Sequence, residues 1–259
     1  MSDGSSVLNR GPVAAVLFDY GLTLVGFERP VAAIEAAQAE IARCIAEAGH
    51  RPPSPVTLRV EVHDRVEAEV RAHENSGALE EIDIVDVERR AFAALGLDLD
   101  DNLLDRCSRI VQEAWFGGVR VDPEVPGVLA TLRSAGLRLG VCSNAAYAPA
   151  SMRDQLRHVG IGDLVDAAVF SSEVGWRKPS PRIFSAALVA LGATPDTTVF
   201  VGDRLREDVG GAHGAGMRAV LVQRRPASEG ERWLAERADA VVTSLRELPA
   251  LVVAAGVTP

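Results

Sequence analysis

Long apolar runs are missing from this sequence of 259 residues. No stretch of about 18 consecutive apolar residues occurs, which excludes a conventional transmembrane helix and argues against a membrane partner. The first twelve residues are polar and lack the apolar segment of a secretory signal, so we expect a disordered leader and a cytoplasmic protein. Cys44, Cys107 and Cys142 show no metal-ligand spacing and cannot all pair, which favours free thiols in a reducing compartment.

Excess positive charge is also missing. The formal net charge is −9 and no basic block occurs, so the composition argues against a nucleic-acid partner. The hydrophobic fraction of 47% and the charged fraction of 24% are ordinary values for a globular protein. The length allows one large domain or two modest ones, and both a monomer and a homodimer remain open.

Lysine is nearly absent. Of the 27 basic residues, 26 are arginines and one, Lys178, is a lysine. It stands in the loop-forming start of the segment GWRKPSPRIF (175–184), directly before a predicted helix. A compact ammonium and a planar guanidinium are not interchangeable beside an anionic ligand, so this single lysine in an arginine-biased chain indicates a specific role.

The segment VAAVLFDYGLTL (13–24) contains the first candidate site residue. Val13 to Phe18 form an apolar run rich in β-branched and aliphatic residues, which predicts a strand buried on both faces. Asp19 follows directly, and Gly21 and Thr23 lie in the loop behind it. Open α/β sheets place their ligand crevice at the carboxyl ends of the strands, so Asp19 could line such a crevice. An aspartate here could equally cap a turn.

Two later segments end in polar residues in the same way. Predicted buried strands over 137–142 and 197–202 are followed by Ser143 and Asp203, and Asp208 comes five residues after Asp203. Because parallel strands bring their carboxyl ends to one edge of a sheet, we expect these side chains to lie near one another.

The pattern between the first strand and these segments is helical for almost a hundred residues. Apolar residues recur at helical spacing over about 30–48, 56–73, 84–95 and 100–116. Strands and helices then alternate, with helices predicted over about 124–136, 149–159, 181–192, 228–238 and 245–256, and strands over 137–142, 166–170, 197–202, 218–222 and 238–244. This order predicts an α/β fold with a doubly wound parallel sheet (core, residues 1–26 and 121–259) and a smaller inserted helical domain (residues 27–120).

An acid, a hydroxyl, an ammonium and an acid pair, in this chain order, resemble the four motifs of the haloacid dehalogenase-like (HAD) hydrolase superfamily. The resemblance covers roughly residues 13–26 and 122–245, and its motifs are specific as a set. It implies a Rossmann-like core with a type-1 helical cap inserted after the first motif, where the helical segment lies. It also implies a Mg²⁺-dependent phosphatase that acts on a small phosphorylated metabolite.

The resemblance assigns metal ligands. By analogy with the family, Asp19 is the nucleophile that becomes an aspartyl-phosphate, and it also binds Mg²⁺. The carbonyl oxygen of Gly21 and the carboxylate of Asp203 complete the protein ligands, with Asp208 binding directly or through water. Oxygen ligands of this kind are the ones that Mg²⁺ prefers.

The resemblance also assigns phosphate ligands. Ser143 is expected to donate a hydrogen bond to the phosphoryl group, helped by the backbone N–H groups of Asn144 and Ala145. Lys178 is expected to neutralise charge on both the phosphate and Asp19.

The sequence departs from the family pattern at Gly21. HAD phosphatases usually carry a second aspartate there, two residues after the nucleophile, as general acid–base, and its loss typically costs about two to four orders of magnitude in rate. The substrate could have a good leaving group, or the protein could bind phosphate compounds and turn them over poorly. A side chain of the cap could also supply the proton, with His63, His73, Glu74 and Glu113 as candidates.

Other functions remain open because of Gly21. The 2-haloacid dehalogenases of the superfamily also lack the second aspartate and need no metal, but their motif has a tyrosine two residues after the nucleophile, whereas Tyr20 follows by one. Phosphonoacetaldehyde hydrolases also resemble the chain at this position, but they need a lysine in the cap, and the only lysine is Lys178, so this function is excluded. A non-catalytic phosphate-binding module is the other alternative that remains open.

Three aromatic residues are candidates for the substrate pocket. Trp176 is the strongest, because it lies beside Lys178, while Trp115 and Phe116 end a predicted helix and could equally pack in a hinge. His213 lies among small residues on a predicted core helix, which favours a structural role.

Overall fold

The computed structural model describes residues 11–224 and 237–254. Most of the expected disordered leader, and the predicted helix over 228–238 except its last two residues, lie outside the described residues. No helix in the described part of the chain is long and apolar enough to cross a membrane.

A six-stranded parallel sheet forms the core, in the order β5-β4-β1-β6-β7-β8. Its strands are β1 (Ala15–Phe18), β4 (Arg138–Ser143), β5 (Ala167–Phe170), β6 (Thr198–Gly202), β7 (Arg218–Val222) and β8 (Ala240–Val242). β4, the second strand of this sheet along the chain, pairs with one side of β1, whereas β6 pairs with the other, so the chain reverses its winding direction around β1. The predicted doubly wound α/β fold is confirmed, and its switch point lies at β1.

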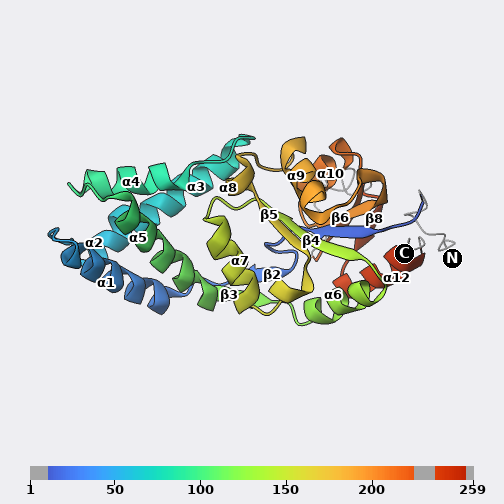
Figure 1. The fold of residues 1–259 in the computed structure, drawn as a ribbon, viewed down its shortest axis with the longest axis horizontal. Helices are drawn as coiled ribbons and strands as arrows, with labels where there is room; N and C mark the ends of the chain where they lie inside the picture. Colours follow the sequence, from blue (N-terminus) through green and yellow to red (C-terminus); the bar gives the residue numbers. More distant parts are fainter. Residues whose placement is uncertain (1–10, 225–236, 255–259) are drawn as a thin grey trace.

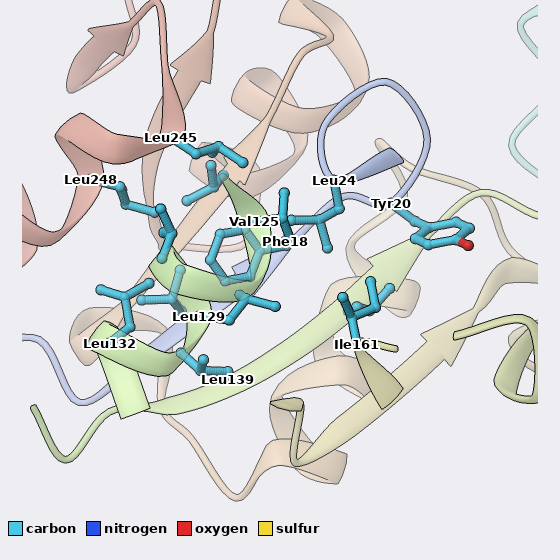
Figure 2. Close-up of a cluster of buried hydrophobic side chains, with 14 of the residues drawn as sticks. Phe18, Tyr20, Leu24, Val125, Leu129, Leu132, Leu139, Ile161, Leu245 and Leu248 are labelled. Atoms are coloured by element: carbon cyan, nitrogen blue, oxygen red, sulfur yellow. The ribbon is translucent and has the colours of Figure 1, made fainter. Parts of the chain in front are cut away.

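The residues of β1 alternate between the two faces of the sheet. Val16 and Phe18 pack on the face covered by α6 (Val125–Ser134), α7 (Pro149–His158) and α12 (Leu248–Ala254), as Figure 2 shows for α6 and the start of α12. Ala15 and Leu17 pack on the opposite face with α9 (Pro181–Leu191) and α10 (Gly211–Gly214). Both faces are therefore buried, which explains why β1 reads as an unbroken apolar run.

The predicted helix after Lys178 has the expected ends. The Ser180 side chain accepts a hydrogen bond at the start of α9, Pro181 occupies the first turn, and Gly192 ends the helix with a left-handed backbone. This chemistry fixes where α9 begins, and with it the length of the loop that carries Lys178.

Residues 28–118, which we call the helical insertion, lie between two short antiparallel strands, β2 (Val25–Phe27) and β3 (Val119–Val121). The insertion contains α1 (Val31–Glu47), α2 (Pro55–Leu58), α3 (Arg65–Ser76), α4 (Ile84–Ala94) and α5 (Asp101–Ala114), with a π-helical segment at Arg59–Asp64 and a 3-10 turn at Trp115–Gly118. Its helices bury a separate apolar cluster and extend away from the sheet (Figure 1).

The two chain segments that connect the insertion to the core pass very close to each other. Glu28 donates its N–H to the carbonyl oxygen of Gly118 at 2.8 Å. A Cβ atom on Gly118 would lie 2.1 Å from the carbonyl oxygen of Glu28 and 2.8 Å from Cδ of Pro30, whereas one on Gly117 would contact nothing within 4 Å.

We therefore expect Gly118→Ala to lower the free energy of unfolding by about 1–3 kcal/mol, because the Glu28 backbone has to move. Gly117→Ala is the matched control and should change it by less than about 0.5 kcal/mol. Urea denaturation measures both. Equal stability of the two variants would contradict the importance of this crossing.

Candidate active site

Three neighbouring strands deliver polar side chains to one edge of the sheet. Asp19 follows β1, Ser143 ends β4, and Asp203 follows β6. Since β4 and β6 flank β1, these residues meet at the switch point, where open α/β sheets bind ligands.

Lys178 lies between two carboxylates. Its Nζ atom donates hydrogen bonds to Oδ1 of Asp19 and to Oδ1 of Asp208, each at 2.7 Å. The lysine side chain is 2% exposed, and burial alone would lower its pKa; Asp19 and Asp208 outweigh this effect and raise the pKa above its usual value. The ammonium therefore stays charged.

Gly202 makes room for Asp208. Oδ2 of Asp208 accepts the backbone N–H of Arg204 at 2.9 Å, which folds the carboxylate back over the end of β6. A Cβ atom on Gly202 would lie 2.3 Å from Oδ2 of Asp208. The GD sequence at the end of β6 thus has a packing reason: a larger residue at position 202 would displace the acid.

Asp203 adds a third carboxylate. Carboxylate oxygens of Asp19, Asp203 and Asp208 lie within 4.8 Å of one another. The Thr23 hydroxyl lies 3.3 Å from Oδ2 of Asp19 and 3.5 Å from Oδ1 of Asp203. Burial and the neighbouring Asp19 raise the pKa of Asp203, and burial raises that of Asp208 to about 7. Three carboxylates thus lie together, and two of them share the ammonium of Lys178, so the cluster has the charge and the oxygen donors that suit a divalent cation.

The residues after β4 have divided roles. Ser143 is buried and lines the cavity described below. The Asn144 side chain accepts the N–H of Lys178 at 2.7 Å and donates to its carbonyl oxygen at 3.2 Å, so it fixes the lysine backbone. The N–H of Ala145 donates to Oγ of Ser171 at 2.7 Å. The prediction that Ala145 helps to bind phosphate is therefore wrong in this structure, because its donor is engaged.

A cavity of about 510 Å³ lies over this cluster, between the sheet edge and the helical insertion. Asp19, Gly21, Ser143, Asn144 and Lys178 line its floor. Its other lining residues include Tyr20, Leu22, Phe27, Arg29, Glu67, Val70, Arg71, Glu74, Gln112, Trp115, Tyr147, Met152, Gln155, Arg177, Arg204 and Glu207. The cavity is large enough for a small metabolite.

Of the three aromatic candidates, Trp115 lines the cavity. Trp176, the preferred candidate, instead stacks on the guanidinium of Arg182, 3.9 Å from the ring centroid. Phe116 packs against His158, with ring centroids 5.4 Å apart. The preference for Trp176 was wrong, because adjacency to Lys178 in the sequence does not determine which way a side chain leaves the loop. For Phe116, packing was one of the two roles left open.

Of the four candidate proton donors, only Glu74 lines the cavity, and it pairs with Arg177 at 3.2 Å. His63 is buried inside the insertion, and Nε2 of His73 lies 2.8 Å from the carbonyl oxygen of Glu80. Glu113 is exposed and does not line the cavity. Glu207, which the sequence pattern did not single out, also lines the cavity and has no ion-pair partner among the described residues.

The insertion is tied to the active-site loops through Glu81. Both oxygens of its carboxylate accept hydrogen bonds from Nη1 of Arg177, each at 2.8 Å. The Glu81 side chain is 2% exposed and the Arg177 side chain 4%. It also accepts the hydroxyl of Ser171, the residue that holds the N–H of Ala145. Backbone hydrogen bonds from Glu81 to Gly175 (3.0 Å) and from Arg177 to Leu79 (2.7 Å) join the two segments. The residue beside Lys178 is thus fixed by the insertion.

A parallel sheet whose first strand ends in a buried aspartate paired with a lysine is the arrangement of a doubly wound α/β protein with a ligand site at the switch point. Comparison with known families agrees, since the profile described as haloacid dehalogenase-like hydrolase matches residues 13–216. The chain belongs to this family, and the resemblance stated from the sequence is confirmed.

Several relatives carry names of enzymes. The chain is 38% identical over 136 residues to a glyceraldehyde 3-phosphate phosphatase from Methanothermobacter thermautotrophicus; the match covers 52% of this chain and 59% of that protein. It is 30% identical over 207 residues to phosphatase MT3486 from Mycobacterium tuberculosis, covering 72% and 90%. Among solved structures, a 2-haloacid dehalogenase from Pseudomonas syringae has a TM-score of 0.65 at 26% identity, covering 93% and 98%. The chain spans about half the length of the first curated relatives it matches.

The Glu81 contact leads to a stability prediction. Glu81→Gln leaves the buried Arg177 guanidinium without its buried carboxylate partner, and we expect the free energy of unfolding to fall by about 3–5 kcal/mol. Glu74→Gln removes the half-exposed partner of the same arginine and should cost less than about 1 kcal/mol. Chemical denaturation of both variants measures the difference. Equal losses would show that the buried contact contributes no more than the exposed one.

Proposed function

We propose that this protein is a Mg²⁺-dependent phosphatase that hydrolyses a small phosphorylated metabolite through an aspartyl-phosphate on Asp19. The observation that supports it most directly is the cluster at the sheet edge, in which Asp19 and Asp208 share the ammonium of Lys178 while Asp203 lies beside them. The phosphatase names of the relatives point to the same reaction.

In the proposed reaction, a carboxylate oxygen of Asp19 attacks phosphorus. A bond forms between Asp19 and the phosphoryl group, and the ester bond to the leaving group breaks, so the leaving group departs with the electron pair and takes up a proton. Water then attacks the acyl-phosphate and releases inorganic phosphate and free Asp19. Lys178 balances negative charge, and the Ser143 hydroxyl and the Asn144 N–H would donate to the phosphoryl oxygens.

Asp19, Asp203 and the carbonyl oxygen of Gly21 would hold Mg²⁺, with Asp208 binding directly or through water. When bound, the cation neutralises charge on the phosphoryl group and on the nucleophile. The residues fit this group, since their carboxylate oxygens lie within 4.8 Å of one another and carry more negative charge than Lys178 offsets.

The helical insertion would act as the cap of this site. It covers the cavity with Val70 of α3, Gln112 of α5 and Trp115 of the 3-10 turn that follows α5. Closing such a cavity excludes water during the first step and leaves substrate choice to the insertion. We propose a cytoplasmic protein, monomeric or homodimeric, that has neither nucleic acid nor membrane as a partner.

A 2-haloacid dehalogenase activity is the second candidate. It is favoured by Gly21, which replaces the usual acid, and by the likeness to the Pseudomonas syringae structure. The hydroxyl of Tyr20 donates to Oε1 of Gln155 at 3.0 Å, so the tyrosine forms part of the cavity wall rather than a free acid. The third carboxylate, Asp203, favours the metal-dependent reaction.

A panel of phosphate esters and acyl phosphates tests the two activities. With Mg²⁺ we expect turnover of at least one compound, loss of more than about a thousandfold in Asp19→Asn, and loss on adding EDTA with recovery on adding excess Mg²⁺. Phosphate release is the measurement. Chloride release from a 2-chloro acid in EDTA would instead support the dehalogenase, and no Asp19-dependent turnover of any compound would support a binding module.

Restoring the missing acid is a second test. A Cβ atom on Gly21 would lie 3.0 Å from Cε2 of Phe27, whose ring is 49% exposed and free to shift. We expect Gly21→Asp to raise kcat for alkyl phosphates by about 10²- to 10⁴-fold, because the leaving alkoxide gains a proton donor. Gly21→Asn matches it in size without an acid. If the two variants turn over alkyl phosphates equally, position 21 is not what limits the rate.

A further inference from the structure

A second, smaller void of about 30 Å³ lies inside the helical insertion. Its wall includes Gln38 from α1, Glu88 from α4, and Ser108 and Gln112 from α5. Gln38, Glu88 and Gln112 are 2%, 8% and 6% exposed, yet Nε2 of Gln38, Oε2 of Glu88 and Oε1 of Gln112 have no hydrogen-bond partner among the described residues. Polar atoms this deeply buried are normally paired, so three of them around one void indicate a binding site.

Gln112 and Glu88 each have one polar atom engaged in a hydrogen bond. Nε2 of Gln112 donates to Oγ of Ser108 at 2.8 Å, and Ser108 donates to Oε1 of Glu88 at 3.0 Å. This chain of hydrogen bonds orients both side chains and leaves one oxygen of each free. These two free atoms are acceptors, so a partner for them must donate hydrogen bonds. Nε2 of Gln38, the third unpaired atom, is a donor, and a hydroxyl can also accept from it.

The void adjoins the active-site cavity. Glu67, Gln112, Trp115 and Tyr147 line both spaces, so the two spaces meet at these residues. Gln112 thus connects the phosphate site to Glu88 through Ser108.

We propose that this void is a specificity subsite that takes a hydrogen-bond-donating end group, an ammonium or a hydroxyl, of the substrate, at the end remote from the phosphoryl group. The proposal rests on the proposed phosphatase function and adds the class of substrate: a phosphate ester with an amine or alcohol terminus. Glu88 and Gln112 are the recognition residues.

Size and charge limit what can enter. A void of about 30 Å³ admits a group the size of one or two water molecules, such as an ammonium or a hydroxyl. A carboxylate terminus would meet Glu88 with like charge, and a methyl terminus would leave both acceptors unpaired. Burial raises the pKa of Glu88 to about 7, which an incoming ammonium would counter. The other acid of the wall, Glu67, forms an ion pair with Arg29 at 2.9 Å through one oxygen, while its Oε1 and Nε2 of His63 also lack a hydrogen bond. Glu88 has no ion-pair partner among the described residues, so it is the acid we assign to the ligand.

The test is a set of linear phosphate esters with two to five carbons that end in an amine, a hydroxyl, a methyl or a carboxylate. At the best chain length, kcat/KM for the amine or hydroxyl ester should exceed that for the methyl ester by about 10- to 100-fold. In Glu88→Leu this preference should fall to less than about threefold. Asp86→Asn, which removes an exposed carboxylate from the same helix, is the control and should keep it.

Glu88→Gln distinguishes recognition of an amine from recognition of a hydroxyl. It keeps the size of the side chain, so it also controls for misfolding of Glu88→Leu. A preference for an amine should be lost in this variant, whereas a preference for a hydroxyl should persist. Preference for the carboxylate or methyl ester in the native protein, or an unchanged preference in Glu88→Leu, overturns the subsite.

Failure of the phosphatase proposal is a distinct result. If no ester is hydrolysed in an Asp19-dependent way, calorimetric binding of the same esters to the Asp19→Asn protein decides the question. Tighter binding of the amine or hydroxyl ester than of the methyl ester, lost when Glu88→Leu is added, supports the subsite. Equal binding of all four termini overturns it.

Discussion

The ammonium of Lys178, held between Asp19 and Asp208, is the interaction on which the site depends. Two carboxylates this deeply buried repel each other, and the ammonium between them makes their burial tolerable. The geometry also accounts for the only lysine in an arginine-rich chain. Nζ reaches both acids from a side chain that is 2% exposed and lies 5.1 Å from the centroid of the Phe200 ring, so a planar guanidinium would not fit without displacing one of them.

The position of that ammonium depends on segments far apart in the chain. The Asn144 side chain, at the end of β4, holds both backbone groups of Lys178, and the preceding residue, Arg177, is anchored by Glu81 of the helical insertion. Glu81 also holds Ser171, which engages the loop after β4. The insertion is therefore part of the support of the catalytic loops as well as a cover for the cavity. Movement of the insertion would therefore displace Arg177 through its buried ion pair with Glu81, and with it the neighbouring Lys178.

The sequence allowed the core to be predicted because its signals are local. A buried strand such as β1 is an apolar run, the end of α9 is a glycine, and the rule that parallel strands end at one edge brings Asp19, Ser143 and Asp203 together without knowledge of the packing. The contacts of the insertion carry no such signal. Glu81 and Arg177 are 96 positions apart, and nothing in the residues around Glu81 distinguishes it from Glu80. The choice of Trp176 over Trp115 failed for the same reason, since side-chain direction in a loop is set by tertiary contacts such as the stacking on Arg182.

The residues that line the cavity limit which group could protonate the leaving group in place of an acid at position 21. Among the carboxylates that line it, Glu67 is paired with Arg29 and Glu74 with Arg177, while Asp19 is paired with Lys178. A carboxylate engaged by a cationic partner is not free to turn toward a leaving group. Of the lining acids in the described part of the chain, Glu207 alone lacks such a partner. A leaving group that needs a proton must therefore obtain it from Glu207 or from solvent, whereas an acyl phosphate or an anhydride needs none. The absence of an acid at position 21 therefore lowers the hydrolysis rate least for acyl phosphates and anhydrides.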